Sequence, residues 1–375
     1  MSVHGRDVRH LIAVVDANEK HRQTVAEAMA PAYRTNAYGD AANALSGMRQ
    51  SLPQVVLVGQ RVGSGLGTNF IKDLRRESAL SNIPIILIID KEDIRILDAV
   101  REMGINKYFV KPYRQIDLIR AVTLKINGEV ERSWQSLPQK QRLALEKTLI
   151  IFNNILEDLT NGNPISYKAV DHSCAAIVDA INENDVSPVV NRVKDHDNFT
   201  FAHSLRMATF LSLFGKGIGL PKDKQILLAS GGFLHDVGKL AVPAETLNKA
   251  EKLTPAEWKL IRGHVAISQK VLAISENIPK AVMTIATQHH ERLDGSGYPL
   301  SLESKDLNQL ARMASIIDVF TALTDRKPYK RAMLAEDALE MMTTEMSKQL
   351  DQGLLAKFRA TVLDLAGTEE PAESR

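Results

Sequence analysis

His289 to Pro299 reads HHERLDGSGYP, and the rest of the chain can be understood around this stretch. It begins with two adjacent histidines, and Glu291 and Asp294 add two carboxylates. Imidazole and carboxylate groups are the usual protein ligands of zinc, iron and manganese. The glycines that follow let the backbone turn sharply and let a ligand approach closely. The stretch therefore predicts a metal site beside a loop.

Helical periodicity dominates on both sides of this stretch, from about Ser187 to the end of the chain. Strand signals are scarce there, and the pattern predicts helices over residues 200–214, 222–234, 254–274, 279–290, 307–323 and 334–343. Thr254 followed by Glu257 is typical of a capping box at a helix N-terminus. We therefore expect an all-helical domain.

Five of the ten histidines lie between residues 203 and 290, inside this helical region. A single histidine on a helix is more often an ordinary core or surface residue. Asp318, however, stands in an apolar helical segment, where an unpaired buried carboxylate is costly. Helices packed around one centre can gather ligands for a pair of metal ions, and no thiolate competes with nitrogen and oxygen. The candidate ligands are His203, His235, Asp236, His264, His289, His290 and Asp318.

From about residue 197 to residue 358 the chain resembles the HD-GYP phosphodiesterases, a subfamily of the HD superfamily. The resemblance rests on HDVGK at 235–239, LTPAEW at 253–258, His264, HHERLDGSGYP at 289–299, Ala311-Arg312-Met313, Asp318 and KPYK at 327–330. It implies hydrolysis of cyclic di-GMP to the linear dinucleotide pGpG, or onward to GMP, in bacterial second-messenger signalling. Another nucleotide phosphohydrolase of the HD superfamily is disfavoured by the glycine-tyrosine-proline loop.

The resemblance also implies a binuclear metal site, commonly of iron or manganese. One ion is expected on His203, His235, Asp236 and Asp318. Asp236 is expected to bridge to a second ion on His264, His289 and His290. Family members with a third ion carry a glutamate four residues before the first histidine. Phe199 stands at that position here and cannot ligate, so we expect two ions.

Catalytic and substrate-binding roles follow from the same resemblance. Two bridged cations activate a shared water and stabilise charge on the phosphate oxygens, so Asp236 is expected to be catalytic. Lys239, three residues later on the same helical face, is expected to reach the phosphate. Lys327 stands where the family usually has arginine, and lysine lacks the bidentate fork of arginine. The expected substrate contacts are Lys239, Lys327, Lys330, Gly297, Tyr298 and Arg312, with Glu291 and Arg292 orienting ligands.

In the N-terminal part, apolar runs alternate with helix-like segments. The runs predict buried strands at 11–15, 54–58, 83–89 and 108–110, and the segments between them predict helices at 22–29, 93–103 and 116–126. Such alternation indicates a parallel, doubly wound sheet. Over residues 8–127 the pattern resembles a response-regulator receiver of flavodoxin-like topology, which implies five parallel strands. Lys111-Pro112 after the last strand is its clearest signature.

The receiver's phosphorylation chemistry is degenerate. Asp16 survives of the usual acidic pair, but Ala17 stands beside it. Gly59 occupies the phosphoacceptor position, and Ile89 occupies the threonine or serine position. Glycine has no nucleophile, and one carboxylate is a poor magnesium site. We therefore expect a pseudo-receiver, which serves either as a scaffold or dimerisation module or as a sensor of another signal.

Residues 128–186 are expected to form a helical linker between this domain and an HD-GYP domain at 187–366, with a polar tail at 367–375. Leu145, Leu149, Phe152, Leu156 and Leu159 recur at heptad spacing in the linker. This spacing suits a dimer coiled coil and also suits an amphipathic helix packed on its own domain. A homodimer through the linker or the receiver therefore stays open, as does a separate signalling partner.

Composition limits the remaining classes. The net charge of +2 offers no strong field for a nucleic acid polymer or a membrane surface. The single cysteine, Cys174, excludes an internal disulfide and suits a reducing compartment. No signal peptide or membrane-length apolar run is evident, so we expect a cytoplasmic protein. The alternative to an enzyme is a catalytically weak cyclic-dinucleotide-binding regulator.

Overall fold

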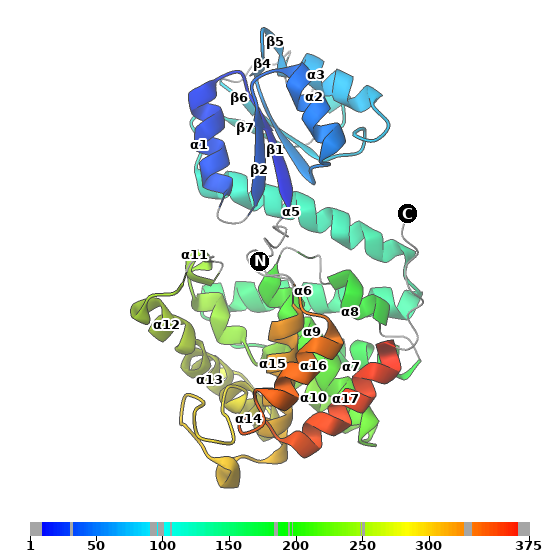
Figure 1. Cartoon of the computed structure of the whole chain (residues 1–375), viewed down its shortest axis with the longest axis vertical. Coiled ribbons are helices and arrows are strands. Elements are labelled where there is room, and N and C mark those ends of the chain that lie inside the picture. The colour runs from blue at the N-terminus through cyan, green and yellow to red at the C-terminus, as the bar shows by residue number, and fades with distance from the viewer. Residues whose placement is uncertain are drawn as a thin grey trace. The chain divides into compact units, whose positions relative to one another are not determined.

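The computed structural model describes residues 10–30, 33–90, 96, 101–105, 107–183, 187–193, 196, 198–247, 249, 252–325 and 332–366. The chain forms two compact units, one reaching to Glu129 and the other beginning at Val130 (Figure 1). In the described residues, no helix combines the length and the apolar character that crossing a bilayer requires.

The first unit is built on a five-stranded parallel sheet. Its strands are β1 (Leu11–Val15), β2 (Arg34–Tyr38), β3 (Val55–Gly59), β6 (Ile85–Ile89) and β7 (Tyr108–Val110), in the order β2-β1-β3-β6-β7. Every residue of β1, β3 and β6 is buried, as strands covered on both faces require. The predicted doubly wound sheet is therefore confirmed. A short antiparallel ribbon joins β4 (Arg61–Val62) to β5 (Gly65–Leu66).

Helices cover both faces of this sheet. In β1, Ala13 and Val15 face a core shared with α2 (Ala41–Gln50) and α3 (Gly67–Arg76), whereas Ile12 and Val14 face a core shared with α1 (Glu19–Met29) and α5 (Gln115–Ser133). Figure 1 shows α1 on the opposite side of the sheet from α2 and α3. The sequence did not predict strand β2, because RTNAY is a half-buried edge strand without an apolar run. The helix predicted at 93–103 lies largely outside the described residues.

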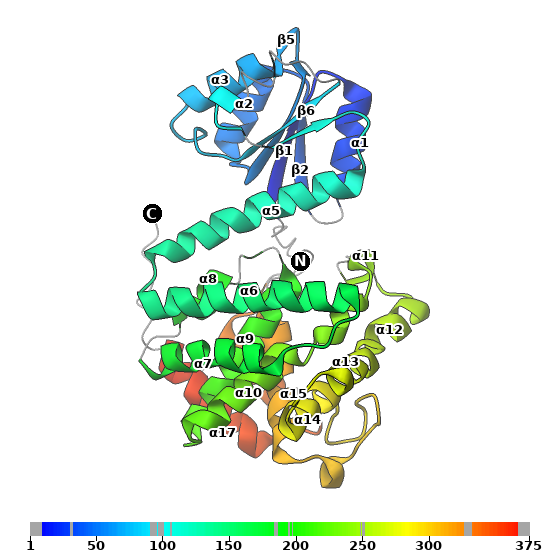
Figure 2. The same ribbon diagram turned by 180° about the vertical axis from the view of Figure 1, so that it is seen from behind.

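The second unit is helical, as predicted. Its longer helices are α6 (Gln139–Asn161), α7 (Tyr167–Asn182), α9 (Phe199–Gly217), α10 (Lys222–Leu234), α12 (Pro255–Arg262), α13 (His264–Ile274), α14 (Lys280–Gln288), α15 (Gln309–Thr324), α16 (Ala335–Thr344) and α17 (Gln352–Ala366). Shorter turns are η1 (Trp134–Ser136), α8 (Ser187–Val193), η2 (Val237–Ala241), α11 (Ala244–Leu247) and η3 (Ser304–Asp306). The two views of Figures 1 and 2 show α9 enclosed by its neighbours.

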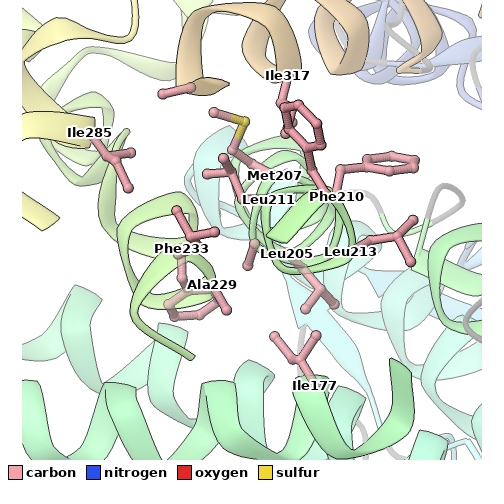
Figure 3. Close-up of a cluster of buried hydrophobic side chains, with 14 of the residues drawn as sticks. Ile177, Leu205, Met207, Phe210, Leu211, Leu213, Ala229, Phe233, Ile285 and Ile317 are labelled. Carbon is pink, nitrogen blue, oxygen red and sulfur yellow. The ribbon is translucent and has the colours of Figure 1, made fainter. Parts of the chain in front are cut away.

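Helix α9 is the centre of one continuous hydrophobic core. Its side chains share this core with Ile177 of α7, Phe233 of α10, Ile285 of α14 and Ile317 of α15 (Figure 3). Burying each such aliphatic or aromatic side chain contributes about 1.5–3 kcal/mol. Because helices from both ends of this unit share the core, α9 and the residues on it are held in a rigid frame.

Helix α6 packs on this same core. Leu145 and Phe152 are buried, and Leu149, Leu156 and Leu159 are partly buried against it. The heptad-spaced face is therefore used inside its own unit, which is the second of the two interpretations that the spacing left open.

One predicted helix is wrong. The segment expected at 254–274 breaks at Gly263 into α12 and α13. The capping box of Thr254 and Glu257 is confirmed at the start of α12, but α12 buries no residue, whereas α13 buries His264, Val265 and Leu272. The two segments therefore have different surroundings, and His264 stands at a helix N-terminus rather than in the middle of a helix.

Candidate metal centre

Asp236 lies between two pairs of histidines. Its Oδ1 is 3.1 Å from Nε2 of His264 and 3.6 Å from Nε2 of His289. Its Oδ2 is 3.2 Å from Nε2 of His235 and 3.5 Å from Nε2 of His203. The carboxylate is 1% exposed, so it meets these four rings away from solvent. Each oxygen therefore faces one pair of imidazoles.

Asp318 joins the same cluster from α15. Its Oδ1 is 3.6 Å from Nε2 of His203, and its Oδ2 is 3.1 Å from Nδ1 of His290. Two overlapping groups of ligand atoms each lie within 4.8 Å of one another, and both include Asp236: one adds His264, His289 and His290, and the other adds His203 and His235. The structure thus brings together all seven ligands that the sequence predicted.

Three of the histidines are oriented in the same way. Nδ1 of His235, of His264 and of His289 lies 2.7, 2.6 and 3.1 Å from the carbonyl oxygen of the residue three positions earlier. An Nδ1–H that donates to a carbonyl leaves Nε2 with its lone pair. Each of these Nε2 atoms faces Asp236, so the main chain itself selects the tautomer that can bind a metal.

His203 is oriented by a carboxylate instead. Its Nδ1 is 2.7 Å from Oδ2 of Asp325, at the C-terminal end of α15. The other oxygen of Asp325 pairs with the buried guanidinium of Arg206, which also donates to Oγ1 of Thr324 at 2.9 Å. Burial lowers the pKa of Arg206 to about 9.

The sequence interpretation missed Asp325 and Arg206, although both carry a signal. A carboxylate at a helix C-terminus opposes the helix dipole, and an arginine within an apolar helix needs a partner. Neither signal identifies the partner, because α9 and α15 meet only in the folded chain.

Electrostatics favour metal binding at His289, His290 and Asp236. Burial lowers the pKa of His289 well below its usual value, and the neighbouring His290 adds to this effect. Burial likewise lowers the pKa of His290 to about 4, against the opposite pull of Asp318. Burial would raise the pKa of Asp236, but the adjacent imidazole of His235 and the positive charge of Lys239 outweigh it and hold that pKa well below the usual value. Neutral imidazoles and ionised carboxylates are suitable ligands for divalent cations.

Two buried polar atoms of the cluster also indicate that a metal binds there. Oδ1 of Asp236 and Nε2 of His290 are buried side-chain atoms that have no hydrogen-bond partner in the described part of the chain. A buried polar atom without a partner is costly and calls for an explanation. A bound cation would supply the missing partner for both atoms.

Local packing brings His264 to Asp236. A side chain at Gly238 would place its Cβ 2.1 Å from the carbonyl oxygen of His264 and 2.6 Å from the amide of Ser268. Only glycine therefore lets η2 approach the first turn of α13. The amide of Gly238 then donates to Oγ of Ser268 at 2.9 Å, and that hydroxyl donates to the carbonyl of His235 at 3.2 Å.

The loop after the two histidines is fixed by Glu291. This carboxylate, 0% exposed, accepts from the amides of Leu300 at 2.7 Å and Leu302 at 2.9 Å. Arg292 donates to Oγ of Ser315 at 2.7 Å and to the carbonyl of His289 at 3.2 Å. Both side chains therefore hold the loop to the ligands rather than joining the cluster.

Tyr298 brings that loop directly to the cluster. Its ring stacks on His290 with a centroid distance of 4.5 Å and an interplanar angle of 28°. At the adjacent Gly297, a Cβ would lie 2.4 Å from Cα of Glu291. A glycine is thus required at the point where the loop returns to the histidines.

The structure describes two of the charged side chains that were expected to contact substrate, Lys239 and Arg312. Nζ of Lys239 lies 2.5 Å from Oδ2 of Asp236, three residues apart as predicted. Arg312 is engaged elsewhere, donating to the carbonyls of Leu307 at 2.9 Å and Ser304 at 2.6 Å and to Oδ2 of Asp351 at 2.9 Å. A substrate contact of Arg312 would have to replace these bonds. Lys327 and Lys330 lie outside the described residues.

The receiver has its own network of polar side chains around Asp16. Oδ2 of Asp16 is 2.6 Å from Nδ1 of His21, whose Nε2 is 2.7 Å from the hydroxyl of Tyr113. Lys111 pairs with Asp90 at 2.9 Å. A Cβ at Gly59 would lie 2.4 Å from Cγ of Asp16, so the retained carboxylate fills the space above the missing acceptor.

Family comparisons agree with both units. Residues 12–123 match the response regulator receiver domain, and residues 189–354 match the HD domain. The chain is therefore a two-domain protein in which a response regulator receiver domain precedes an HD domain. The receiver and the HD fold expected from the two resemblances are confirmed.

Several relatives are similar to all or part of the chain. The chain is 29% identical to a cyclic di-GMP phosphodiesterase response regulator from Xanthomonas campestris pv. campestris, over 97% of this chain and 92% of the relative. It is 27% identical to a cyclic di-GMP phosphodiesterase from Pseudomonas aeruginosa, over 66% of this chain and 62% of the relative. A match at 36% identity to 3'3'-cGAMP-specific phosphodiesterase 1 of Vibrio cholerae covers 42% of this chain and 37% of that protein.

Among solved structures, the fold is similar to a HDG"Y"P protein from Bdellovibrio bacteriovorus, with a TM-score of 0.50 and 17% identity. This match covers 66% of this chain and 80% of that one, and it supports the fold.

Proposed function

We propose that this protein is a metal-dependent phosphodiesterase that hydrolyses cyclic di-GMP to pGpG, GMP or both. One observation carries the proposal: the two carboxylate oxygens of Asp236 face different pairs of imidazole Nε2 atoms, at 3.1–3.6 Å. The names of the relatives support the substrate class.

We infer a binuclear centre of iron or manganese. When bound, two such ions supply an activated water and stabilise negative charge on the phosphate oxygens. Asp236 presents one oxygen to each side of the centre. Lys239, 22% exposed and next to Asp236, is placed to turn toward a phosphate oxygen. The ring of Tyr298 covers His290 and keeps water from that side of the cluster.

The test combines metal analysis with turnover. Anaerobically purified protein is expected to contain close to two equivalents of iron or manganese and to convert cyclic di-GMP to pGpG or GMP. Asp236→Ala and His235→Ala are expected to lose both metal and product formation. His172→Ala is the matched control, because this histidine is exposed on α7 and should leave both unchanged.

A cyclic-dinucleotide-binding regulator is the competing function. Tight binding of cyclic di-GMP without product, in reducing buffer with iron or manganese, would favour that regulator and reject the enzyme. Running cyclic GMP-AMP beside cyclic di-GMP in the same assay determines which of the two is preferred.

A further inference from the structure

A groove of about 500 Å³ lies on the surface of α12, outside the metal cluster. It is lined by Leu253, Pro255, Trp258, Lys259 and Arg262. Trp258 is 48% exposed, although a large aromatic side chain gains most when it is fully buried. No residue of α12 is buried, so this exposed tryptophan is not explained by packing of the helix.

A ladder of planar side chains links the groove to the metal cluster. The guanidinium of Arg262 lies 5.8 Å from the ring centroid of Trp258 and 5.0 Å from that of Tyr298. The ring of Tyr298 in turn stacks on His290 at 4.5 Å. A ligand held at the cluster can therefore extend along this ladder without leaving the protein surface.

The ladder has the chemistry of a nucleobase site. An exposed tryptophan face stacks on any base, and arginine adds a stacking cation. Arginine also presents two parallel N–H donors, which match the O6 and N7 acceptors of guanine, whereas adenine offers one acceptor and one donor there. Arg262 forms no salt bridge within the described part of the chain, so its donors are available for such an edge.

We propose that Trp258 and Arg262 form a guanine-binding subsite for one base of the cyclic dinucleotide. Trp258 stacks on the base, and Arg262 reads its O6/N7 edge while Tyr298 supports the guanidinium from the other side. This inference rests on the proposed function, because it takes the scissile phosphate to lie at the cluster. The subsite makes the protein select guanine over adenine at this position.

Tryptophan fluorescence provides a test that is independent of turnover. The chain has two tryptophans, and Trp134 is 1% exposed, so changes on ligand addition report Trp258. The full chain is titrated with GMP and with AMP, which contain no diester bond and report base binding whether or not the cluster hydrolyses anything. We expect saturable quenching by GMP and affinity for AMP that is weaker by about fivefold or more.

Variants separate the edge contact from charge and from helix stability. Arg262→Lys keeps the charge but loses the fork, so it is expected to lose the preference for GMP over AMP. Arg262→Ala and Trp258→Ala are expected to raise KM for cyclic di-GMP about tenfold with little change in kcat, as loss of uniform binding does. Leu260→Ala is the control, because Leu260 is 44% exposed on the same helix and does not line the groove.

Three results would overturn the subsite: no saturable quenching by GMP, equal affinities for GMP and AMP, or an unchanged KM in Arg262→Ala. A protein that binds GMP in this way but never hydrolyses cyclic di-GMP would instead reject the proposed function and leave the base contact standing. A protein that hydrolyses cyclic di-GMP with no quenching would reject the subsite alone.

Discussion

At the residue scale, the cluster depends on which nitrogen of each histidine faces its centre. Main-chain carbonyls make that choice for His235, His264 and His289, and such partners are insensitive to mutation of a side chain. His203 differs because a carboxylate, Asp325, makes the choice. Among the four histidines that face Asp236, His203 is therefore the one whose orientation a single side-chain substitution can change.

Asp325→Asn is expected to weaken metal binding by about 10- to 100-fold, the usual effect of removing a partner that orients a histidine ligand. The amide keeps a similar volume beside Arg206, so the fold should survive. Manganese affinity is measured by calorimetry, with circular dichroism to verify the fold. Asp73→Asn, at an exposed carboxylate of α3, is the control. An unchanged manganese affinity would mean that Asp325 does not orient His203.

In the receiver, any side chain at residue 59 would enter the space that the Asp16 carboxylate fills. Gly59→Ala is expected to lower the free energy of unfolding by about 1–3 kcal/mol, because its Cβ meets the buried carboxylate of Asp16. The loss should shrink in an Asp16→Ala background, where that carboxylate is gone. Urea denaturation of the two single variants and the double variant measures the coupling.

Gly65→Ala is the control for this pair, since its Cβ meets only one atom, at an ordinary 3.7 Å. Additive effects of the two substitutions would show that Asp16 does not fill the acceptor position. We also expect no phosphoprotein from acetyl phosphate, because no nucleophile stands at residue 59.

At the element scale, the distance between His264 and Asp236 depends on how closely η2 approaches α13. Gly238 allows that approach, and the break at Gly263 places His264 in the first turn of α13. The two nearest atoms that a Cβ at Gly238 would meet are the carbonyl oxygen of His264 and the amide of Ser268, and such backbone atoms cannot rotate away as a side-chain end can. A small change here should therefore displace a whole helix end.

Gly238→Ala is expected to lower the manganese content by about half, because His264 moves away from Asp236 while His203 and His235 keep their partners. The protein should also lose about 1–3 kcal/mol of stability. Metal analysis and urea denaturation measure both effects. Gly128→Ala in α5 is the matched control, since its Cβ meets nothing within 4 Å, and it should be neutral or slightly stabilising. Full metal content in Gly238→Ala would contradict the role of this close approach.

At the scale of the whole molecule, each unit has its own core. The receiver has a core on each face of its sheet, and the helical unit has one core that extends from Trp134 to Val362. Units with separate cores generally fold separately. All seven candidate metal ligands lie in the helical unit.

A fragment of residues 130–375 is expected to fold and to retain the metal content and turnover of the full chain. Cys174 provides a probe of its folding, because this thiol is fully buried and burial raises its pKa to about 12. A thiol reagent at pH 8 should therefore label Cys174 only after the helical unit unfolds. Inactivity of a folded fragment would show that catalysis needs the receiver.

The sequence alone determined the two fold classes, because periodicity reflects burial: continuous apolar runs mark strands covered on both faces, and the 3.6-residue pattern marks helices with one buried face. It also predicted the candidate ligand types, since imidazole and carboxylate are the usual metal-binding groups that the motifs offer. It missed β2, whose half-buried edge position leaves no apolar run. It also missed the break at Gly263, since helical periodicity continues through that residue.

Only the tertiary structure decided how those ligands are arranged. Asp325 lies 119 residues after Arg206 in the chain, and it meets both Arg206 and His203 because α9 and α15 pack together. The same packing gives each oxygen of Asp236 its own pair of histidines and places Tyr298 between the cluster and Arg262. Local sequence sets which groups are present, whereas distances between groups on different helices depend on the packing of the whole core.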